Sequence, residues 1–167
     1  MVSELRNIVV LPNRKVPKFV SNDACAAVTF VGSRHGSRTP PKLLRRVPRV
    51  IVRADDCYPQ SSIGSVALTS KDADRIASFI ASQSSRVATL LVSCKHGQGR
   101  SASVALVVAA AYGLDWERFV RAPYAPNGWI VDLLRSAFRR RGMEVPANLA
   151  RFDGTYHRQD CTIAADG

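Results

Sequence analysis

Several patterns that would assign the chain to a well-defined class of protein are missing. Its four cysteines, Cys25, Cys57, Cys94 and Cys161, form no Cys-x-x-Cys pair, and no cysteine and histidine cluster has the spacing of a zinc site. The first fifteen residues hold only a short apolar patch, 8–11, so no secretory signal is recognised. The longest uncharged run, 101–114, is shorter than the roughly 20 residues of a membrane span. We therefore expect no transmembrane segment, no metal and no cofactor, and a reducing, cytoplasmic location.

Acidic residues are also scarce. The 167 residues include 24 lysines and arginines but only 13 aspartates and glutamates, which gives a net charge of +11. Such an excess indicates an anionic partner: a phosphorylated protein, RNA or another nucleic acid, or acidic lipid headgroups. The alternative is that the charge serves only solubility. With 46% hydrophobic residues and no internal repeat, the chain has the material for one domain with a real core.

The apolar patterns predict alternating strands and helices. We expect strands at 8–11 (an edge strand), 26–31, 50–52 and 87–92, with Pro12 and Pro17 breaking regular structure between the first two. We expect helices after Thr69, over 101–112, after Asp115 and up to about Arg141. This order predicts a single-domain α/β fold, with a mostly parallel central sheet flanked by helices, over residues 1–141. Residues 142–167 are expected to be a tail, packed on the surface or partly disordered.

Residues 93–101, Ser-Cys-Lys-His-Gly-Gln-Gly-Arg-Ser, are the most informative part of the sequence. A strand leads in and a long uncharged helix leads out, so a glycine loop is expected at a helix start. There, backbone N–H groups and the helix dipole favour an anion, and the same field favours the thiolate form of Cys94. Arg100 can grip two phosphate oxygens with its planar fork. The alternative is a buried structural cysteine beside a surface arginine.

The pattern Cys-x5-Arg-Ser after a strand resembles the signature of the cysteine-dependent protein-tyrosine and dual-specificity phosphatases. The resemblance implies that Cys94 is the nucleophile, that Arg100 binds the phosphate, and that Ser101 assists the thiolate as it leaves. One departure is that Ser93 stands where the family usually has histidine. Ser93 motivates a different hypothesis, that the chain is a weakly active or inactive phosphate-binding protein.

In the family an aspartate on an upstream loop protonates the leaving oxygen. Asp55 and Asp56 follow the strand 50–52, and we prefer Asp56 because it lies nearer the turn that follows. The alternative is that the pair is only a turn or a cap. Asp72 and Asp74 are worse candidates, because both suit the start of a helix.

The other residues of the loop are predicted to bind the substrate. They are Lys95, His96, Gly97, Gln98 and Gly99, together with Arg100. Lysine after the cysteine resembles phosphoinositide-directed relatives, and histidine two after it resembles RNA 5′-triphosphatases. The alternative is that both side chains point to solvent. Further basic residues that can reach an extended anionic substrate are Arg34, His35, Arg38, Arg45, Arg46 and Arg49.

Taken together, these residues predict a phosphatase acting on phosphotyrosine or phosphoserine/threonine in proteins through a cysteinyl-phosphate. The alternative enzyme uses the same site on RNA 5′-phosphates or on phosphoinositides. The alternative of another class is the phosphate-binding pseudophosphatase.

Overall fold

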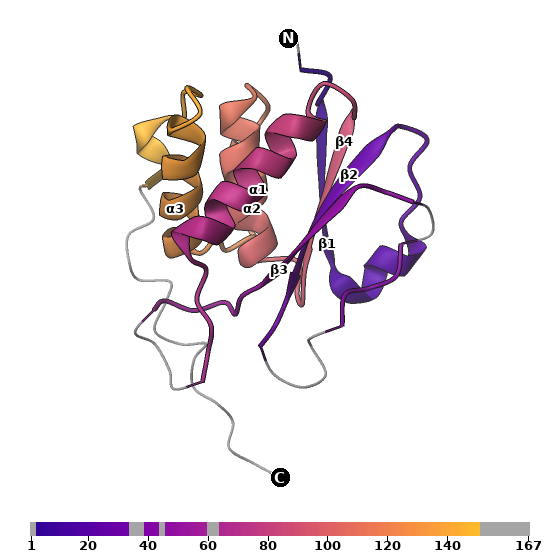
Figure 1. Ribbon diagram of the computed structural model, residues 1–167, viewed down its shortest axis with the longest axis horizontal. Helices are drawn as coiled ribbons and strands as arrows, with labels where there is room; N and C mark the ends of the chain where they lie inside the picture. Colours follow the sequence, from indigo (N-terminus) through magenta and orange to yellow (C-terminus); the bar gives the residue numbers. More distant parts are fainter. Residues whose placement is uncertain (1–2, 34–38, 44–45, 60–63, 151–167) are drawn as a thin grey trace.

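A four-stranded parallel sheet forms the centre of the molecule. The computed structural model describes residues 3–33, 39–43, 46–59 and 64–150. Its strands lie in the order β1 (Asn7–Pro12), β4 (Thr89–Cys94), β2 (Cys25–Val31) and β3 (Arg49–Arg53), and every neighbouring pair is parallel (Figure 1). The predicted α/β fold with a parallel central sheet is confirmed, as is the edge position of β1.

Three helices cover one face of this sheet: α1 (Ser70–Gln83), α2 (Arg100–Ala111) and α3 (Gly128–Arg139) (Figure 1). The capping box expected after Thr69 is present, because the Thr69 hydroxyl accepts from the Asp72 N–H at 3.2 Å and the Asp72 carboxylate accepts from the Thr69 N–H. α2 is buried nearly all round, as its uncharged sequence predicts.

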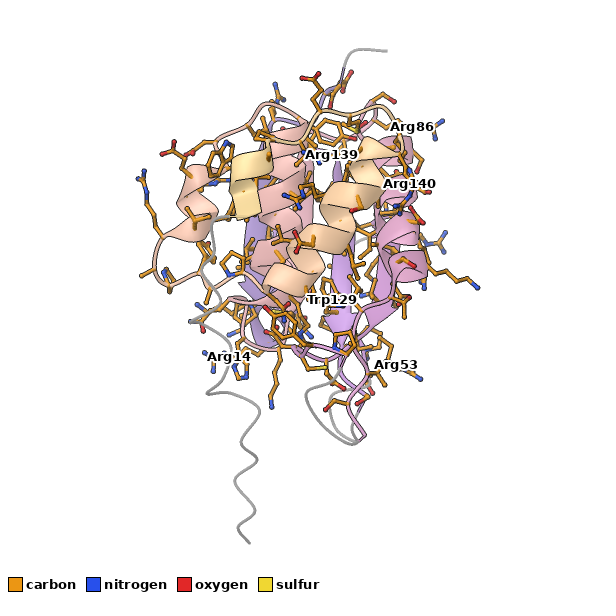
Figure 2. The ribbon with its side chains drawn as sticks, turned by 90° about the vertical axis from the view of Figure 1, so that its left-hand side faces the viewer. Arg14, Arg53, Arg86, Trp129, Arg139 and Arg140 are labelled. Atoms are coloured by element: carbon orange, nitrogen blue, oxygen red, sulfur yellow. The ribbon has the colours of Figure 1, made fainter. Side chains whose placement is uncertain are left out.

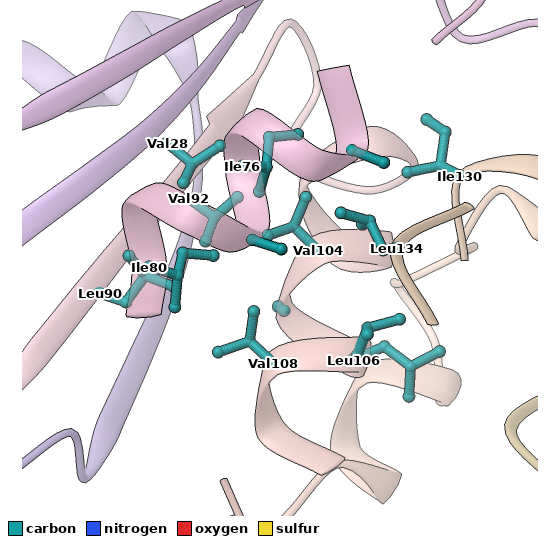
Figure 3. Close-up of a cluster of buried hydrophobic side chains, with 14 of the residues drawn as sticks. Val28, Ile76, Ile80, Leu90, Val92, Val104, Leu106, Val108, Ile130 and Leu134 are labelled. Carbon is teal, nitrogen blue, oxygen red and sulfur yellow. The ribbon is translucent and has the colours of Figure 1, made fainter. Parts of the chain in front are cut away.

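Both faces of the sheet are buried, which explains why its central strands are apolar without interruption. On the helical face, Val28 and Val92 pack with residues of the three helices, among them Ile76, Ile80, Val104, Val108 and Leu134 (Figure 3). On the opposite face, Ala27 and Leu91 pack against Val16 in a smaller cluster. Burial at successive positions of β2 and β4 fixes their register, because a slip of one residue would exchange the two faces.

The element that supplies Val16 was not predicted. Residues Asn13–Lys18 form a short 3-10 helix, η1, even though Pro17 lies inside it. A second 3-10 helix, η2 (Glu117–Val120), follows Trp116 without a side-chain cap, so the prediction that Asp115 caps a helix there is wrong. A third, η3 (Ala147–Ala150), follows α3, and both Val145 and Leu149 are buried in the main core.

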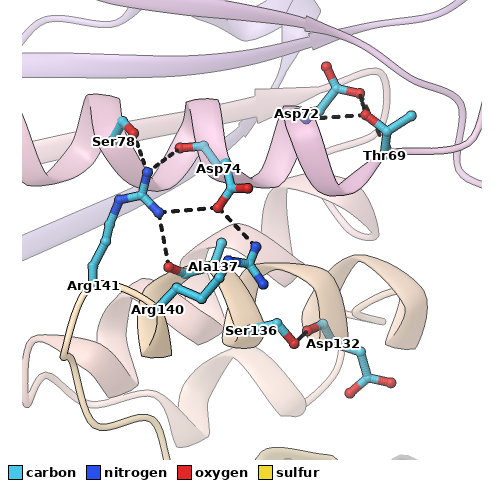
Figure 4. Close-up of polar contacts among 9 residues, drawn as sticks. All are labelled: Thr69, Asp72, Asp74, Ser78, Asp132, Ser136, Ala137, Arg140 and Arg141. Atoms are coloured by element: carbon cyan, nitrogen blue, oxygen red, sulfur yellow. Dashed lines mark hydrogen bonds and ion pairs between the residues drawn. The ribbon is translucent and has the colours of Figure 1, made fainter.

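Arginines at the end of α3 tie it to α1. Arg140 Nη2 lies 2.9 Å from Asp74 Oδ1, and Arg141 Nη1 lies 3.2 Å from the same oxygen (Figure 4). Arg141 also donates to the Ser78 hydroxyl and to the Asp74 carbonyl. These cations therefore join two helices and do not serve the dipole of α3 alone. In the part of the chain that the structure describes, no helix has the length and apolar character needed to cross a membrane.

Candidate active site

The loop between β4 and α2 surrounds the sulfur of Cys94. Cys94 is the last residue of β4 and Arg100 is the first of α2. The sulfur lies 3.0 Å from Ser101 Oγ and accepts from the Gly97 N–H at 3.3 Å. Cys94 is only 2% exposed and Ser101 is fully buried. A hydroxyl and a backbone N–H that can each donate a hydrogen bond to the sulfur therefore lie within contact of it.

Two glycines allow this loop to lie close to its neighbours. Gly97 has φ +72°, and a Cβ there would lie 2.6 Å from the backbone nitrogen of Pro12 at the end of β1. A Cβ at Gly99 would overlap the Oδ2 of Asp56. Any larger residue would therefore push the loop away from β1 or from the aspartate, and the glycine pattern has a local steric cause.

Arg100, at the start of α2, is buried with part of its guanidinium unpaired in the described residues. The residue is 6% exposed, and its Nη1 donates to the Ala54 carbonyl at 2.6 Å. Its Nε is buried and has no hydrogen-bond partner within the described ranges. A buried cationic donor without a partner is costly unless an anion satisfies it. The residue thus has the donors and the charge to hold a phosphate.

Asp55 is tied into its own loop. Its carboxylate accepts from the Ser33 N–H at 3.1 Å, from the Ser33 hydroxyl, and from the Val66 N–H at 2.9 Å. Burial acts to raise the pKa of Asp55, but these hydrogen bonds and the charge of Arg100 together hold it below its ordinary value. The Asp55 carboxylate therefore anchors its own loop to Ser33 and Val66.

Asp56 faces the loop instead. Its Oδ1 accepts from Asn127 Nδ2 at 2.9 Å, and its Oδ2 lies against Gly99. Asn127 engages only one of the two oxygens, and the other lies beside the loop between β4 and α2.

Asn127 was not singled out from the sequence. It is 1% exposed, its Oδ1 accepts from the Ile130 N–H at the start of α3, and its own N–H donates to Ser103 Oγ at 2.7 Å. It thus joins α2, α3 and the Asp56 loop. The Pro-Asn-Gly triplet at 126–128 is typical of a break between elements, but nothing local in the sequence predicts the contact with Asp56.

Ser93, at the position where histidine is usual, points to the neighbouring strand. It is fully buried, and its Oγ donates to Thr29 Oγ1 of β2 at 3.3 Å. The serine hydroxyl is therefore satisfied within the sheet.

A cavity of about 470 Å³ opens beside the loop. Lys95, His96 and Gln98 are exposed and line it with Arg100. The remaining lining residues are Pro12, Asn13, Arg14, Phe30, Gly32 and Thr39. Sequence analysis missed Arg14 and Asn13, because they belong to η1, which was expected to be irregular.

Two of the other basic candidates, Arg46 and Arg49, lie away from this cavity. Arg49 begins β3, at the opposite end of the strands from Cys94, and donates to the Pro41 carbonyl at 2.7 Å. Arg46 lines a separate cavity of about 600 Å³. Arg34, His35, Arg38 and Arg45 lie outside the described residues. Among the residues described, no three histidine, cysteine or acidic side chains are grouped to hold a metal ion.

Comparison with known proteins supports the fold. No model of a protein family matches the sequence, and no curated protein matches it. Among solved structures, human DUSP28 is similar, with a TM-score of 0.55 and 16% identity over 85% of this chain and 98% of that one. PTPMT1 in complex with PI(5)P has a TM-score of 0.51 and 10% identity over 83% and 93%. Tk-PTP in its active form has a TM-score of 0.50 and 17% identity over 83% and 97%. These likenesses confirm the predicted phosphatase fold.

Proposed function

We propose that this chain, which has the fold of the cysteine-dependent phosphatases, hydrolyses phosphate monoesters through a cysteinyl-phosphate intermediate. The observation that carries the proposal is the surroundings of Cys94. Its sulfur receives the Gly97 N–H and lies 3.0 Å from Ser101 Oγ, at the start of α2, with the unpaired Nε of Arg100 buried nearby. A nucleophile, an anion-binding loop and a cationic donor are thus present together.

In the first step the Cys94 thiolate attacks phosphorus, and the bond from phosphorus to the ester oxygen breaks. The leaving oxygen takes a proton from Asp56, whose Oδ2 lies beside the loop at Gly99. Arg100 and the loop N–H groups stabilise the negative charge on the transferring phosphoryl oxygens. The products of this step are the free alcohol and the cysteinyl-phosphate.

In the second step a water molecule attacks the phosphorus of the cysteinyl-phosphate. The Asp56 carboxylate takes a proton from this water, and the sulfur–phosphorus bond breaks. Ser101 Oγ, 3.0 Å from the sulfur, donates to the thiolate as it leaves. Inorganic phosphate is released, and both Cys94 and Asp56 return to their starting states.

Two classes of substrate are compatible with this chemistry. The first is a protein carrying phosphotyrosine or phosphoserine/threonine. The second is a substrate with more negative charge, such as a phosphoinositide or an RNA 5′-phosphate, and the exposed Lys95 and His96 beside the cavity favour it. Parallel assays with phosphopeptides, phosphoinositides and 5′-triphosphorylated RNA distinguish the two.

Turnover of an aryl phosphate tests the activity itself. We expect hydrolysis by the wild-type protein, loss of at least about a thousandfold in Cys94→Ser, and retained oxyanion binding in that variant. Mass spectrometry of acid-quenched protein should detect one added phosphoryl group on a peptide containing Cys94. A wild-type protein that binds phosphate without turnover would instead support the pseudophosphatase suggested by Ser93.

A further inference from the structure

The cavity beside the phosphate loop is larger than a single phosphate group requires. Its volume of about 470 Å³ is in the range of sites that take whole small molecules. The loop residues Lys95, His96, Gln98 and Arg100 form one wall, and residues at the end of β1 and the start of η1 form the other. A substrate held by Arg100 would therefore extend between these two walls.

The cavity is cationic on both sides. The cation Arg14 comes from η1 and the cation Lys95 from the loop after β4, where His96 follows it, and all three side chains are exposed. None of the described residues lining the cavity is acidic, and no ion pair engages Arg14 or Lys95 within the described part of the chain. By contrast, Arg121, Arg135, Arg140 and Arg141 each pair with a carboxylate. The cavity cations are therefore available to a second anionic group.

A further polar group of the lining, the Asn13 amide, suits a hydroxyl. Asn13 Nδ2 donates to the Phe30 carbonyl at 2.9 Å, which fixes the amide, and its buried Oδ1 has no partner among the described residues. An unsatisfied buried acceptor takes a hydroxyl or N–H donor. Phe30 lines the cavity but is fully buried, so the exposed ring of His96 is the one aromatic surface that the described lining offers to a base. The choice of a polyol over RNA therefore rests on the unpartnered Asn13 acceptor, which suits a hydroxyl.

We infer that Arg14, with Lys95 and His96, binds a second phosphate of the substrate, and that the substrate is a polyol bisphosphate. This inference rests on the proposed function and selects the second of its two substrate classes. The scissile phosphate lies in the Cys94 loop, the neighbouring phosphate contacts Arg14, and a hydroxyl of the polyol donates to Asn13. Arg14 is then a residue that determines specificity.

Binding to the Cys94→Ser variant tests this without requiring turnover. The probes are inositol 4,5-bisphosphate and inositol 4-phosphate, titrated by calorimetry at low and moderate salt. We expect the bisphosphate to bind about tenfold more tightly, because a charge-assisted hydrogen bond contributes that much. Adding Arg14→Ala should remove most of this preference, and raising the salt should weaken it.

Arg53→Ala is the matched control. Arg53 ends β3 at the same end of the molecule as Arg14, is exposed, and does not line the cavity (Figure 2). Arg53→Ala removes one positive charge, as Arg14→Ala does. An equal loss of the bisphosphate preference in both variants would mean that overall charge, and not a subsite, causes the effect. That result would overturn the inference.

The other outcomes are equally distinct. Equal affinity of the two inositol phosphates overturns the inference and leaves the proposed function intact, provided that aryl phosphate is still hydrolysed. Tighter binding of a 5′-triphosphorylated RNA than of the bisphosphate overturns the polyol assignment. A bisphosphate preference without any turnover supports the subsite and refutes the proposed function. Repeating the titration with vesicles that carry the corresponding phosphoinositide separates a lipid headgroup from a free inositol phosphate as the source, and the inference holds for either.

Discussion

At the scale of single residues, Asp55 and Asp56 are neighbours with different surroundings. Asp55 is held by Ser33 and Val66, and Asp56 faces the loop at Gly99. If Asp56 is the acid, Asp56→Asn should lower kcat by about 10²–10⁴-fold for alkyl phosphates. The loss should shrink for nitrophenyl phosphate, whose leaving group needs no proton. Steady-state kinetics across leaving groups of different basicity measures this dependence.

Asp55→Asn is the comparison for that experiment. Because Asp55 anchors its loop as a carboxylate, we expect its loss to be the same for every leaving group, together with a lower melting temperature. A loss at Asp55 alone that grows with leaving-group basicity would reverse the assignment of the acid. Equal losses at both aspartates, whatever the leaving group, would mean that the pair is structural.

For Arg100, the contribution of the planar guanidinium can be separated from the contribution of the positive charge. Its Nη1 is already engaged by Ala54 at 2.6 Å, so the rest of the planar fork is left for phosphate. Lysine keeps the positive charge but cannot provide this geometry. Arg100→Lys should therefore lower kcat/KM for an aryl phosphate by about 10²–10³-fold. Wild-type kcat/KM in a folded lysine variant would show that Arg100 does not clamp the substrate.

At the scale of elements, the contact between α1 and α3 depends on Asp74. The hydrogen bond from Arg140, opposed by desolvation and aided by Arg141, lowers the pKa of Asp74 below its ordinary value. A lowered pKa stabilises the fold above the unfolded value of about 3.9, and this contribution is lost as pH falls through the folded value. Because the pair is exposed, Asp74→Asn should cost less than about 1 kcal/mol at pH 7, and the cost should shrink toward pH 3.

Urea denaturation at several pH values measures that difference. Asp132→Asn is a suitable control, because Asp132 pairs with Arg135 inside α3, at 3.0 Å, and joins no second helix. The Asp132 variant should lose less stability at pH 7. A cost for Asp74→Asn that does not change with pH would indicate that the carboxylate charge is not responsible.

Elements were predictable wherever a local pattern decided them. The capping box at Thr69 and the uncharged run of α2 are local, and both elements formed where expected. η1 was missed because Pro12 and Pro17 indicated a break in regular structure. The 3-10 helix nevertheless forms with Pro17 inside it, and its residue Val16 is buried against the sheet. Asp115 was misassigned because aspartate is a good cap in general, but η2 begins two residues later without one.

At the scale of the whole molecule, the site depends on contacts between distant segments. Cys94 and the pair Asp55–Asp56 each follow a predicted strand, and the carboxyl ends of parallel strands meet at one end of a sheet, so a shared site was predictable. The sequence could not predict that Asn127 binds Asp56, 71 residues away, or that Arg14 reaches the same cavity as Lys95. Those contacts arise from how α3 and η1 pack, which no local pattern encodes.

The net charge of +11 also acts at this scale. A strongly cationic protein attracts an anionic substrate over distances comparable with the Debye length, so association should weaken as salt is added. We expect kcat/KM to fall with ionic strength more steeply for a phosphopeptide flanked by aspartates than for one flanked by lysines. The proposed chemical step depends on the buried Cys94 and Arg100 and not on the field of the whole molecule, so kcat should change little for either peptide. Stopped-time assays in sodium chloride and in sodium acetate, at equal ionic strength, distinguish two effects. Screening should lower kcat/KM equally in both salts, whereas competition for the site by one anion should lower it only in that salt. Identical salt slopes for the two peptides would show that the excess charge does not guide substrates to this site.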